Sequence, residues 1–204
     1  MNPTKIVCVG RNYAAHAREL GNDVPERPLL FLKPPSTLIG AGADIVLPRD
    51  SQHVEHEAEI GIVIGRRARH VSAAEALACV AGYAAVNDVT ARDLQKLDVQ
   101  FTRAKGYDTF CPVGTVAPAP DWRALEVIGR VNGEVRQHGH ATDMIFGVPD
   151  IIAYISRIMT LEPGDIIATG TPEGVSPLRP GDVVEIEIPG ISRVKNTVIQ
   201  DMTE

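Results

Sequence analysis

Short apolar runs bounded by turn residues recur along the chain and predict a structure rich in β-strands. We expect buried strands of this kind at residues 6–9, 29–32, 44–47, 57–64 and 83–87. Three later strands are expected at residues 165–168, 182–188 and 193–199. The first two of these come directly after Pro-Gly dipeptides, which favour tight turns.

One dipeptide predicts a hairpin in the second half of the chain. Asn132-Gly133 separates residues 128–131 from residues 134–137, and Asn-Gly is a strong signal for a two-residue hairpin turn. The two flanking segments should therefore pair as antiparallel strands.

Helices are expected at only a few places. Ser72 and Glu75 have the spacing of a capping box, Pro149 suits the first turn of a helix, and Gly21 suits the position after a helix end. The expected helices span residues 13–20, residues 73–80 and residues 149–158.

The order of these elements predicts the fold class. Strands outnumber helices, hairpins are frequent, and no regular alternation of strand and helix is present. We expect an α+β, mostly β architecture with largely antiparallel pairing. The Pro-rich stretch at residues 117–122 resembles a linker, but neither side of it alone has enough strands for a stable sheet. It is therefore expected to bound an excursion of the chain, and a single domain over residues 1–204 is predicted.

Composition excludes several classes of function. The 204 residues are 44% hydrophobic, which suffices for a real core, and the net charge of −6 argues against a nucleic-acid surface. The three cysteines lack metal-binding spacing, and no apolar run has the length of a secretion signal or a membrane span. We expect a cytoplasmic protein with reduced thiols that binds neither nucleic acid nor membrane.

Two glutamates at the start of an apolar strand are the first candidate for chemistry. Glu57 and Glu59 are two residues apart, so in a strand their side chains share one face, with the carboxylates roughly 6–7 Å apart. Asp88 ends the strand expected at residues 83–87 and is the best third ligand. Three carboxylates suit a hard divalent cation such as Mg²⁺ or Mn²⁺. The alternative is that both glutamates face solvent on an edge strand while Asp88 opens a turn.

Other residues could assist such a centre. His16 and Glu19 are three residues apart on a predicted helix, where a carboxylate can orient an imidazole that acts as a general base. Lys105, flanked by small residues, could stabilise developing negative charge in a pocket. The turn at residues 169–174 could bind an anion through hydroxyl and N–H groups. An exposed helix pair, a surface lysine and a plain turn are the respective alternatives.

Six segments together resemble the fumarylacetoacetate hydrolase family, and most of all its short members of the acylpyruvate hydrolase kind. They occur in the family's order, from about residue 6 to residue 198. The segments are residues 10–16 (GRNYAAH), 31–34 (FLKP), 56–61 (HEAEIG), 87–95 (NDVTARDLQ), 104–112 (AKGYDTFCP) and 169–175 (TGTPEGV).

The resemblance implies a fold and a set of roles. The fold would be a mixed β-roll or sandwich of the family's C-terminal-domain type, with a few short helices, in a homodimer. Mg²⁺ or Mn²⁺ would be held by Glu57, Glu59 and Asp88. The remaining roles are a water-activating dyad of His16 and Glu19, charge stabilisation by Lys105, and substrate orientation by Arg11, Arg92, Gln95 and Thr171.

The resemblance also implies a reaction. The expected substrate is a small oxo acid, an acylpyruvate such as fumarylpyruvate or acetylpyruvate, which hydrolysis would cleave to pyruvate and a carboxylic acid. Decarboxylation of oxaloacetate, or isomerisation or decarboxylation of a 2-hydroxy-dienoate, would use the same site. A non-catalytic metal-binding scaffold is the alternative from another functional class.

Overall fold

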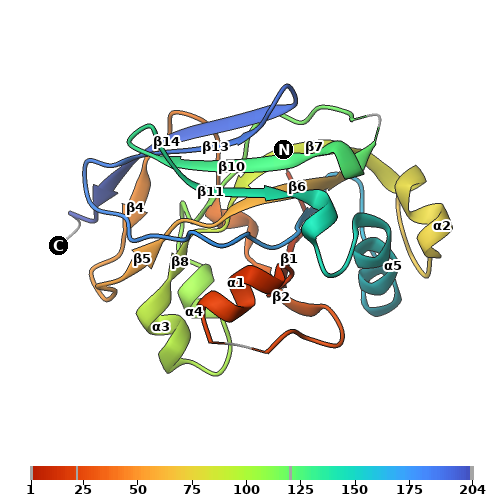
Figure 1. The fold of residues 1–204 in the computed structure, drawn as a ribbon, viewed down its shortest axis with the longest axis horizontal. Helices are drawn as coiled ribbons and strands as arrows, with labels where there is room; N and C mark the ends of the chain where they lie inside the picture. The colour runs from red at the N-terminus through yellow and green to blue at the C-terminus, as the bar shows by residue number, and fades with distance from the viewer. Residues whose placement is uncertain (1, 22, 120, 203–204) are drawn as a thin grey trace.

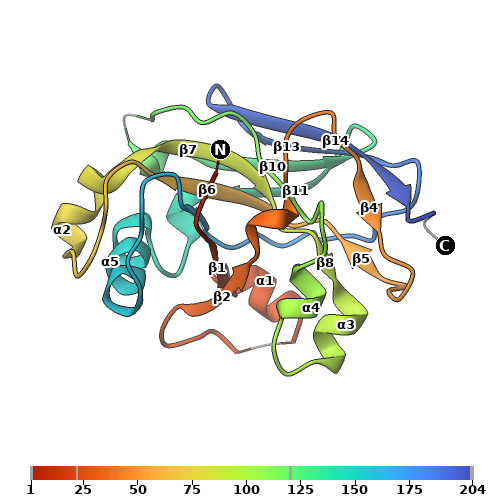
Figure 2. The ribbon, with the colours of Figure 1, turned by 180° about the vertical axis from the view of Figure 1, so that it is seen from behind.

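Two five-stranded sheets and several short helices make up the computed structural model, which describes residues 2–21, 23–119 and 121–202. Figure 1 shows the sheets crossing the middle of the molecule, with α1 (Ala14–Glu19), α3 (Arg92–Leu97) and α4 (Thr102–Lys105) grouped below them. The view from behind in Figure 2 shows α2 (Ala73–Ala76) and α5 (Val148–Ile158) together at the end of the molecule opposite the C-terminus.

The first sheet has the order β2-β1-β12-β6-β7. Strands β1 and β12 are parallel, while the other neighbours in this sheet are antiparallel. Its strands are β1 (Ile6–Gly10), β2 (Leu29–Lys33), β6 (Ala58–Ile64), β7 (Val80–Asn87) and β12 (Ile166–Ala168).

The second sheet has the order β11-β10-β13-β14-β4 and is antiparallel except between β14 and β4. Its strands are β4 (Ile45–Leu47), β10 (Glu126–Val131), β11 (Glu134–His140), β13 (Val183–Ile188) and β14 (Ser192–Gln200). Two short ladders complete the β structure: β3 (Leu38–Ile39) with β9 (Cys111–Pro112), and β5 (Val54–Glu55) with β8 (Thr90–Ala91). Single 3₁₀ turns occur at Pro35–Thr37, Leu77–Cys79, Trp122–Ala124 and Ala141–Asp143.

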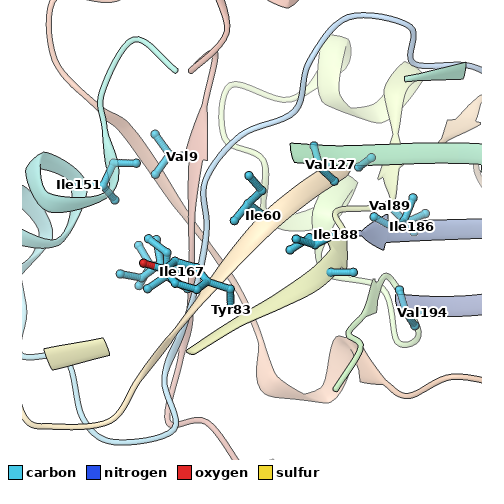
Figure 3. Close-up of a cluster of buried hydrophobic side chains, with 14 of the residues drawn as sticks. Val9, Ile60, Tyr83, Val89, Val127, Ile151, Ile167, Ile186, Ile188 and Val194 are labelled. Atoms are coloured by element: carbon cyan, nitrogen blue, oxygen red, sulfur yellow. The ribbon is translucent and has the colours of Figure 1, made fainter. Parts of the chain in front are cut away.

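The main core lies where β6 and β7 pack against β10, β13 and β14 of the other sheet. Figure 3 shows Ile60 of the first sheet near Val127 and Ile188 of the second, and Tyr83 beside Ile167 of its own sheet. Alternate residues of β10 and β13 are buried, so each strand turns one apolar face inward. The mostly β, mixed architecture expected from the sequence is therefore confirmed.

Most expected elements occur, and their ends differ for tertiary reasons. Asn132 and Gly133 have φ values of 53° and 84°, as a type I′ hairpin turn requires. The capping box of Ser72 and Glu75 is present. The helix expected at residues 73–80 was too long, because Val80 pairs with Ile64 and already belongs to β7.

The Pro-rich stretch at residues 117–122, of which residue 120 lies outside the described residues, begins beside β7. Ala117 exchanges two backbone hydrogen bonds with Tyr83 of β7, so this segment is tied to the first sheet. Cys8, Cys79 and Cys111 are all buried free thiols, as the sequence suggested. No helix in the described part of the chain is long and apolar enough to span a bilayer.

Candidate active site

A cavity of about 380 Å³ opens between the first sheet and the helices α1, α3 and α4, and we call it the active-site pocket. All ten residues that the sequence analysis selected line it, although they come from five separate segments of the chain. These residues are Arg11, His16, Glu19, Glu57, Glu59, Asp88, Arg92, Gln95, Lys105 and Thr171.

The pairing of β6 with β7 brings the three acidic residues together. Ala58 pairs with Asn87 in this ladder, and the backbone N–H of Asp88 donates to the carbonyl oxygen of Glu57 at 2.9 Å. The end of one strand therefore meets the start of its neighbour. Carboxylate oxygens of Glu57, Glu59 and Asp88 lie within 4.8 Å of one another, closer than strand spacing alone suggested. Glu57 precedes β6 and does not belong to it, which corrects the expected start of that strand.

All three carboxylates are buried, which excludes the alternative of a solvent-facing edge strand. Lys105 Nζ donates to Glu57 Oε2 and to Asp88 Oδ2, at 2.7 Å each. Arg92 Nη2 donates to Glu57 Oε1 at 2.5 Å. Burial by itself raises the pKa of Glu57, but Lys105 and Arg92 lower this pKa to well below its usual range.

Glu59 is in the opposite electrostatic state. Within the described residues it forms no ion pair, and it accepts a hydrogen bond from the backbone N–H of Gly170 at 2.8 Å. Burial, followed by the nearby charges of Asp88 and Glu57, raises the pKa of Glu59 well above its usual range. The cluster therefore contains one carboxylate whose negative charge the nearby Lys105 and the Gly170 N–H offset only in part.

This donor set fits a hard divalent cation. Its ligands are carboxylate oxygens, which Mg²⁺ and Mn²⁺ prefer, and they converge from three residues at one end of a pocket. The ammonium of Lys105 lies between Glu57 and Asp88, so this position already holds a positive charge. A cation beside Glu59 would supply the compensation that this carboxylate lacks.

His16 and Glu19 form a hydrogen-bonded pair on α1. His16 Nδ1 lies 3.0 Å from Glu19 Oε2, and the other oxygen, Glu19 Oε1, accepts from the backbone N–H of Gly174 at 3.0 Å. The carboxylate is thereby fixed on both sides, and His16 is buried. The pair has the arrangement of a carboxylate-oriented general base.

The turn between β1 and α1 fixes the position of this pair. Arg11 has a φ of 58°, an uncommon left-handed conformation for a residue other than glycine. The buried side chain of Asn12 holds the turn, because its Nδ2 donates to the carbonyl oxygens of Thr169 and Phe146. The turn is thus tied to the segment that carries Thr171.

The four residues expected to orient substrate differ in their contacts. Arg92 is bound to Glu55 and Glu57 and also donates to Gln95 Oε1 at 2.5 Å. Thr171 Oγ1 donates to the carbonyl oxygen of Ala58 at 2.9 Å. Arg11, by contrast, forms no ion pair within the described residues. The Arg11 guanidinium can therefore pair with an anionic ligand, whereas that of Arg92 is already paired with Glu55 and Glu57.

A family model for the fumarylacetoacetate (FAA) hydrolase C-terminal domain matches residues 5–199. The chain belongs to the fumarylacetoacetate hydrolase family. The expectation based on the six sequence segments is therefore confirmed.

The named relatives of this chain differ in activity. The chain is 49% identical to the mitochondrial oxaloacetate tautomerase of Arabidopsis thaliana, over 94% of this chain and 89% of that protein. It is 46% identical to the mitochondrial oxaloacetate decarboxylase of Dictyostelium discoideum, over 92% and 89% of the two chains.

Solved structures of the family have the same fold. The 5-carboxymethyl-2-hydroxymuconate delta-isomerase of Mycobacterium smegmatis superposes with a TM-score of 0.92 at 44% identity, covering 100% of this chain and 81% of that one. Fumarylpyruvate hydrolase of Pseudomonas aeruginosa, in complex with Mn²⁺ and pyruvate, gives 0.91 at 31% identity, covering 97% and 90%.

Two buried residues of this family member escaped the sequence reasoning as site residues. Lys33 Nζ donates to Asp88 Oδ1 at 2.7 Å, so Asp88 is held by two lysines. Gln137 accepts from the backbone N–H of Ala58 and donates to Thr171 Oγ1, linking the acidic strand to the Thr171 segment. Gln137 is buried, while the residues on either side of it in β11 are exposed. The local sequence therefore contains no signal that Gln137 supports the site.

Proposed function

We propose that this protein is a divalent-metal-dependent enzyme that acts on small 2-oxo acids, with hydrolysis of acylpyruvates as its leading reaction. One observation carries the proposal: three buried carboxylates able to hold a metal line the same pocket as a carboxylate-oriented histidine. We further propose Mg²⁺ or Mn²⁺ as the metal, held by Glu57, Glu59 and Asp88. When bound, that ion would act as a Lewis acid toward the oxygens of the oxo acid.

Each remaining residue has a proposed task in hydrolysis. Arg11 would bind the substrate carboxylate, since its charge is not used by an acidic partner. His16, with its ring oriented by Glu19, would take a proton from water. The water oxygen would then form a bond to the distal carbonyl carbon of the acylpyruvate.

Cleavage of the carbon–carbon bond completes the reaction. The electron pair of that bond would move to the pyruvyl carbon, giving an enolate that accepts a proton to become pyruvate. The other product is the carboxylic acid formed from the distal carbonyl. Lys105 would lower the energy of the developing negative charge, because Asp88 and Glu57 raise its pKa further than burial lowers it and so keep it protonated.

Oxaloacetate is the second candidate substrate, and the relatives favour it. A tautomerase and a decarboxylase that act on oxaloacetate are 49% and 46% identical to this chain, while the fumarylpyruvate hydrolase is 31% identical. Decarboxylation needs no activated water. Tautomerisation needs proton transfer, for which His16 is suited.

The proposal is tested with purified protein and a panel of acetylpyruvate, fumarylpyruvate and oxaloacetate. Turnover should require Mg²⁺ or Mn²⁺ and should stop in excess EDTA. The His16→Ala variant should lose about 10²–10⁴-fold in acylpyruvate hydrolysis, and much less in oxaloacetate decarboxylation. His70→Asn is the matched control, because His70 is exposed and its φ of 54° suits asparagine.

The outcomes separate the alternatives. Equal losses of both reactions in His16→Ala would mean that His16 does not activate water. Metal-dependent turnover of oxaloacetate alone would establish the second candidate. Absence of turnover with every substrate in the panel would favour a metal-binding scaffold instead.

The assembly and extent of the protein are also proposals. The family match over residues 5–199 supports one catalytic domain spanning residues 1–204. A homodimer is proposed from the resemblance to the family, and light scattering on the purified protein tests it. A cytoplasmic location stays a prediction.

A further inference from the structure

A second group of metal-ligand side chains lies on the edge of the other sheet. Glu126 begins β10, while His138 and His140 belong to β11, the edge strand that lies beside β10 (Figure 1). In the β10–β11 register Glu126 is the direct partner of His140, and Ile128 is the partner of His138. Residues two apart in a strand share a face, so all three side chains project from the same side of the sheet.

The three side chains already converge. His138 Nε2 lies 2.7 Å from Glu126 Oε2, and His140 Nδ1 lies 3.9 Å from the same oxygen. The two imidazole rings are 5.1 Å apart between centroids. One ligand atom from each residue lies within 4.8 Å of the others.

The backbone beneath this group is held firmly. Gln137 and Gly139 lie on the opposite face of β11 and are buried, and Gln137 is hydrogen-bonded to Ala58 and Thr171. Gly139 lies so close to Pro172 that a Cβ there would contact its ring at 2.7 Å. The N–H of His140 also donates to Asp143 Oδ2 at 3.3 Å. The strand positions of the ligands are therefore set by packing, while the two histidine side chains are about half exposed and that of Glu126 is 32% exposed.

We propose that Glu126, His138 and His140 form a second metal site, selective for a late transition-metal ion such as Zn²⁺, Ni²⁺ or Cu²⁺. Two imidazoles and one carboxylate suit these ions, whereas Mg²⁺ prefers oxygen ligands. Zinc–nitrogen bonds of about 2.0–2.1 Å place tetrahedral ligand atoms about 3.3 Å apart. The His138–Glu126 contact at 2.7 Å would therefore open slightly and His140, at 3.9 Å, would approach, which partly exposed side chains can do by rotation. Water would complete the coordination shell.

The site differs in kind from the carboxylate cluster of the active-site pocket. The pocket cluster offers three carboxylates, while the edge site offers two nitrogens and one oxygen. A metal at the edge would join β10 to β11 outside the catalytic machinery. The simpler interpretation is a partly exposed His–Glu pair on the sheet edge that contributes little to stability and binds no metal.

The test is isothermal titration of Zn²⁺ and Ni²⁺ into the full chain in a non-chelating buffer. The wild type should bind one equivalent more than the double variant His138→Gln/His140→Gln. The single variant Glu126→Gln should bind this additional equivalent with an affinity lower by about 10–100-fold or more, the loss that follows even when a group supporting a metal ligand is removed. His70→Asn removes an exposed histidine elsewhere and should match the wild type.

A spectroscopic readout identifies the ligands directly. With Cu²⁺, the wild type and His70→Asn should give nitrogen couplings in electron paramagnetic resonance that the double variant lacks. Melting temperatures in EDTA should be the same for all four proteins, because the altered side chains are exposed or half-exposed. Equal stoichiometry and affinity in the wild type and the double variant, or Cu²⁺ spectra without a difference, would overturn the proposal.

Discussion

Replacing Glu59 by glutamine is expected to stabilise the metal-free protein while removing its response to metal. In the structure, Glu59 is buried with two other carboxylates within 4.8 Å and forms no ion pair among the described residues. Two unit charges at such a separation repel each other by about 3–4 kcal/mol at an effective dielectric constant of about 20. Lys105 and the Gly170 N–H offset part of this repulsion.

The net gain should be about 1–2 kcal/mol in the free energy of unfolding. A glutamine keeps an oxygen that can accept from Gly170, and its amide hydrogens face carboxylates that can accept them. For a chain of this length, such a gain corresponds to a rise in melting temperature of about 2–8 °C. The same substitution at Glu57 should have the opposite sign, because it removes the partner of Lys105 and Arg92 and should cost about 3–5 kcal/mol.

The pH dependence gives a second readout. The pKa of Glu59 is raised in the folded state, so its ionisation is harder in the folded chain than in the unfolded chain. The resulting penalty grows as pH rises from the usual glutamate pKa through the folded one. The advantage of Glu59→Gln should therefore be small near pH 5 and larger at pH 8, in thermal melts recorded with EDTA.

Metal should reverse the order of stability. A ligand at 100 times its dissociation constant stabilises a folded protein by about 2.7 kcal/mol. In saturating Mn²⁺ the wild type should gain this amount and Glu59→Gln should gain little. If Glu59→Gln is less stable than the wild type in EDTA at every pH, the carboxylate is not uncompensated and the reasoning is refuted.

Three further predictions concern groups that support the site and the sheets. Asp165 accepts five hydrogen bonds from Thr4, Lys5 and Glu162. Burial raises the pKa of Asp165, but these hydrogen bonds lower it further, to below its usual value. Asp165→Asn should therefore lower the free energy of unfolding, measured in urea at pH 7, by about 2–4 kcal/mol. This loss should shrink as pH falls from the usual aspartate pKa through the lowered pKa of folded Asp165, because protonation then favours the unfolded wild-type chain. A loss that does not shrink at all at acidic pH would contradict the assignment. Gly174 has a φ of +97°, and a Cβ added there would overlap the carbonyl oxygen of Arg136, so Gly174→Ala should lower the melting temperature. It should also lower kcat, because the Gly174 N–H holds Glu19. An unchanged kcat would show that this contact does not position the His16–Glu19 pair. Gln137→Leu should lower the free energy of unfolding by about 2–3 kcal/mol, because the Ala58 N–H is left unpaired. It should also raise KM for the oxo acid, because Thr171 loses its contact with Gln137. An unaltered KM in a folded variant would limit Gln137 to a structural role.

Local signals in the sequence predicted much of the fold, and their failures have a common cause. The Asn132-Gly133 turn and the capping box at Ser72 depend on contacts within a few residues, and both are present. Val80 was expected to end a helix, but its pairing with Ile64 places it in a strand. The two-residue strands of the β3–β9 and β5–β8 ladders are too short to produce any periodic pattern.

The candidate site divides in the same way. Residue type and spacing marked the acidic residues, the His16–Glu19 pair and Lys105 only as candidates, and the family resemblance selected them. The ion pairs of Lys105 with Glu57 and Asp88, and the second lysine on Asp88, had no local signal. They arise from contacts between residues 17 to 55 positions apart in the chain.

By itself the sequence determined which donor groups are available and which segments form strands, because those properties depend on side-chain chemistry and on neighbours along the chain. Only the tertiary structure decided which charges are balanced. The antiparallel pairing of β6 with β7 places Asp88 against Glu57, and burial there removes the water that would otherwise screen Glu59. The electrostatic deficit that invites a cation is therefore a property of the fold, since it depends on distances and exposure that no single segment contains.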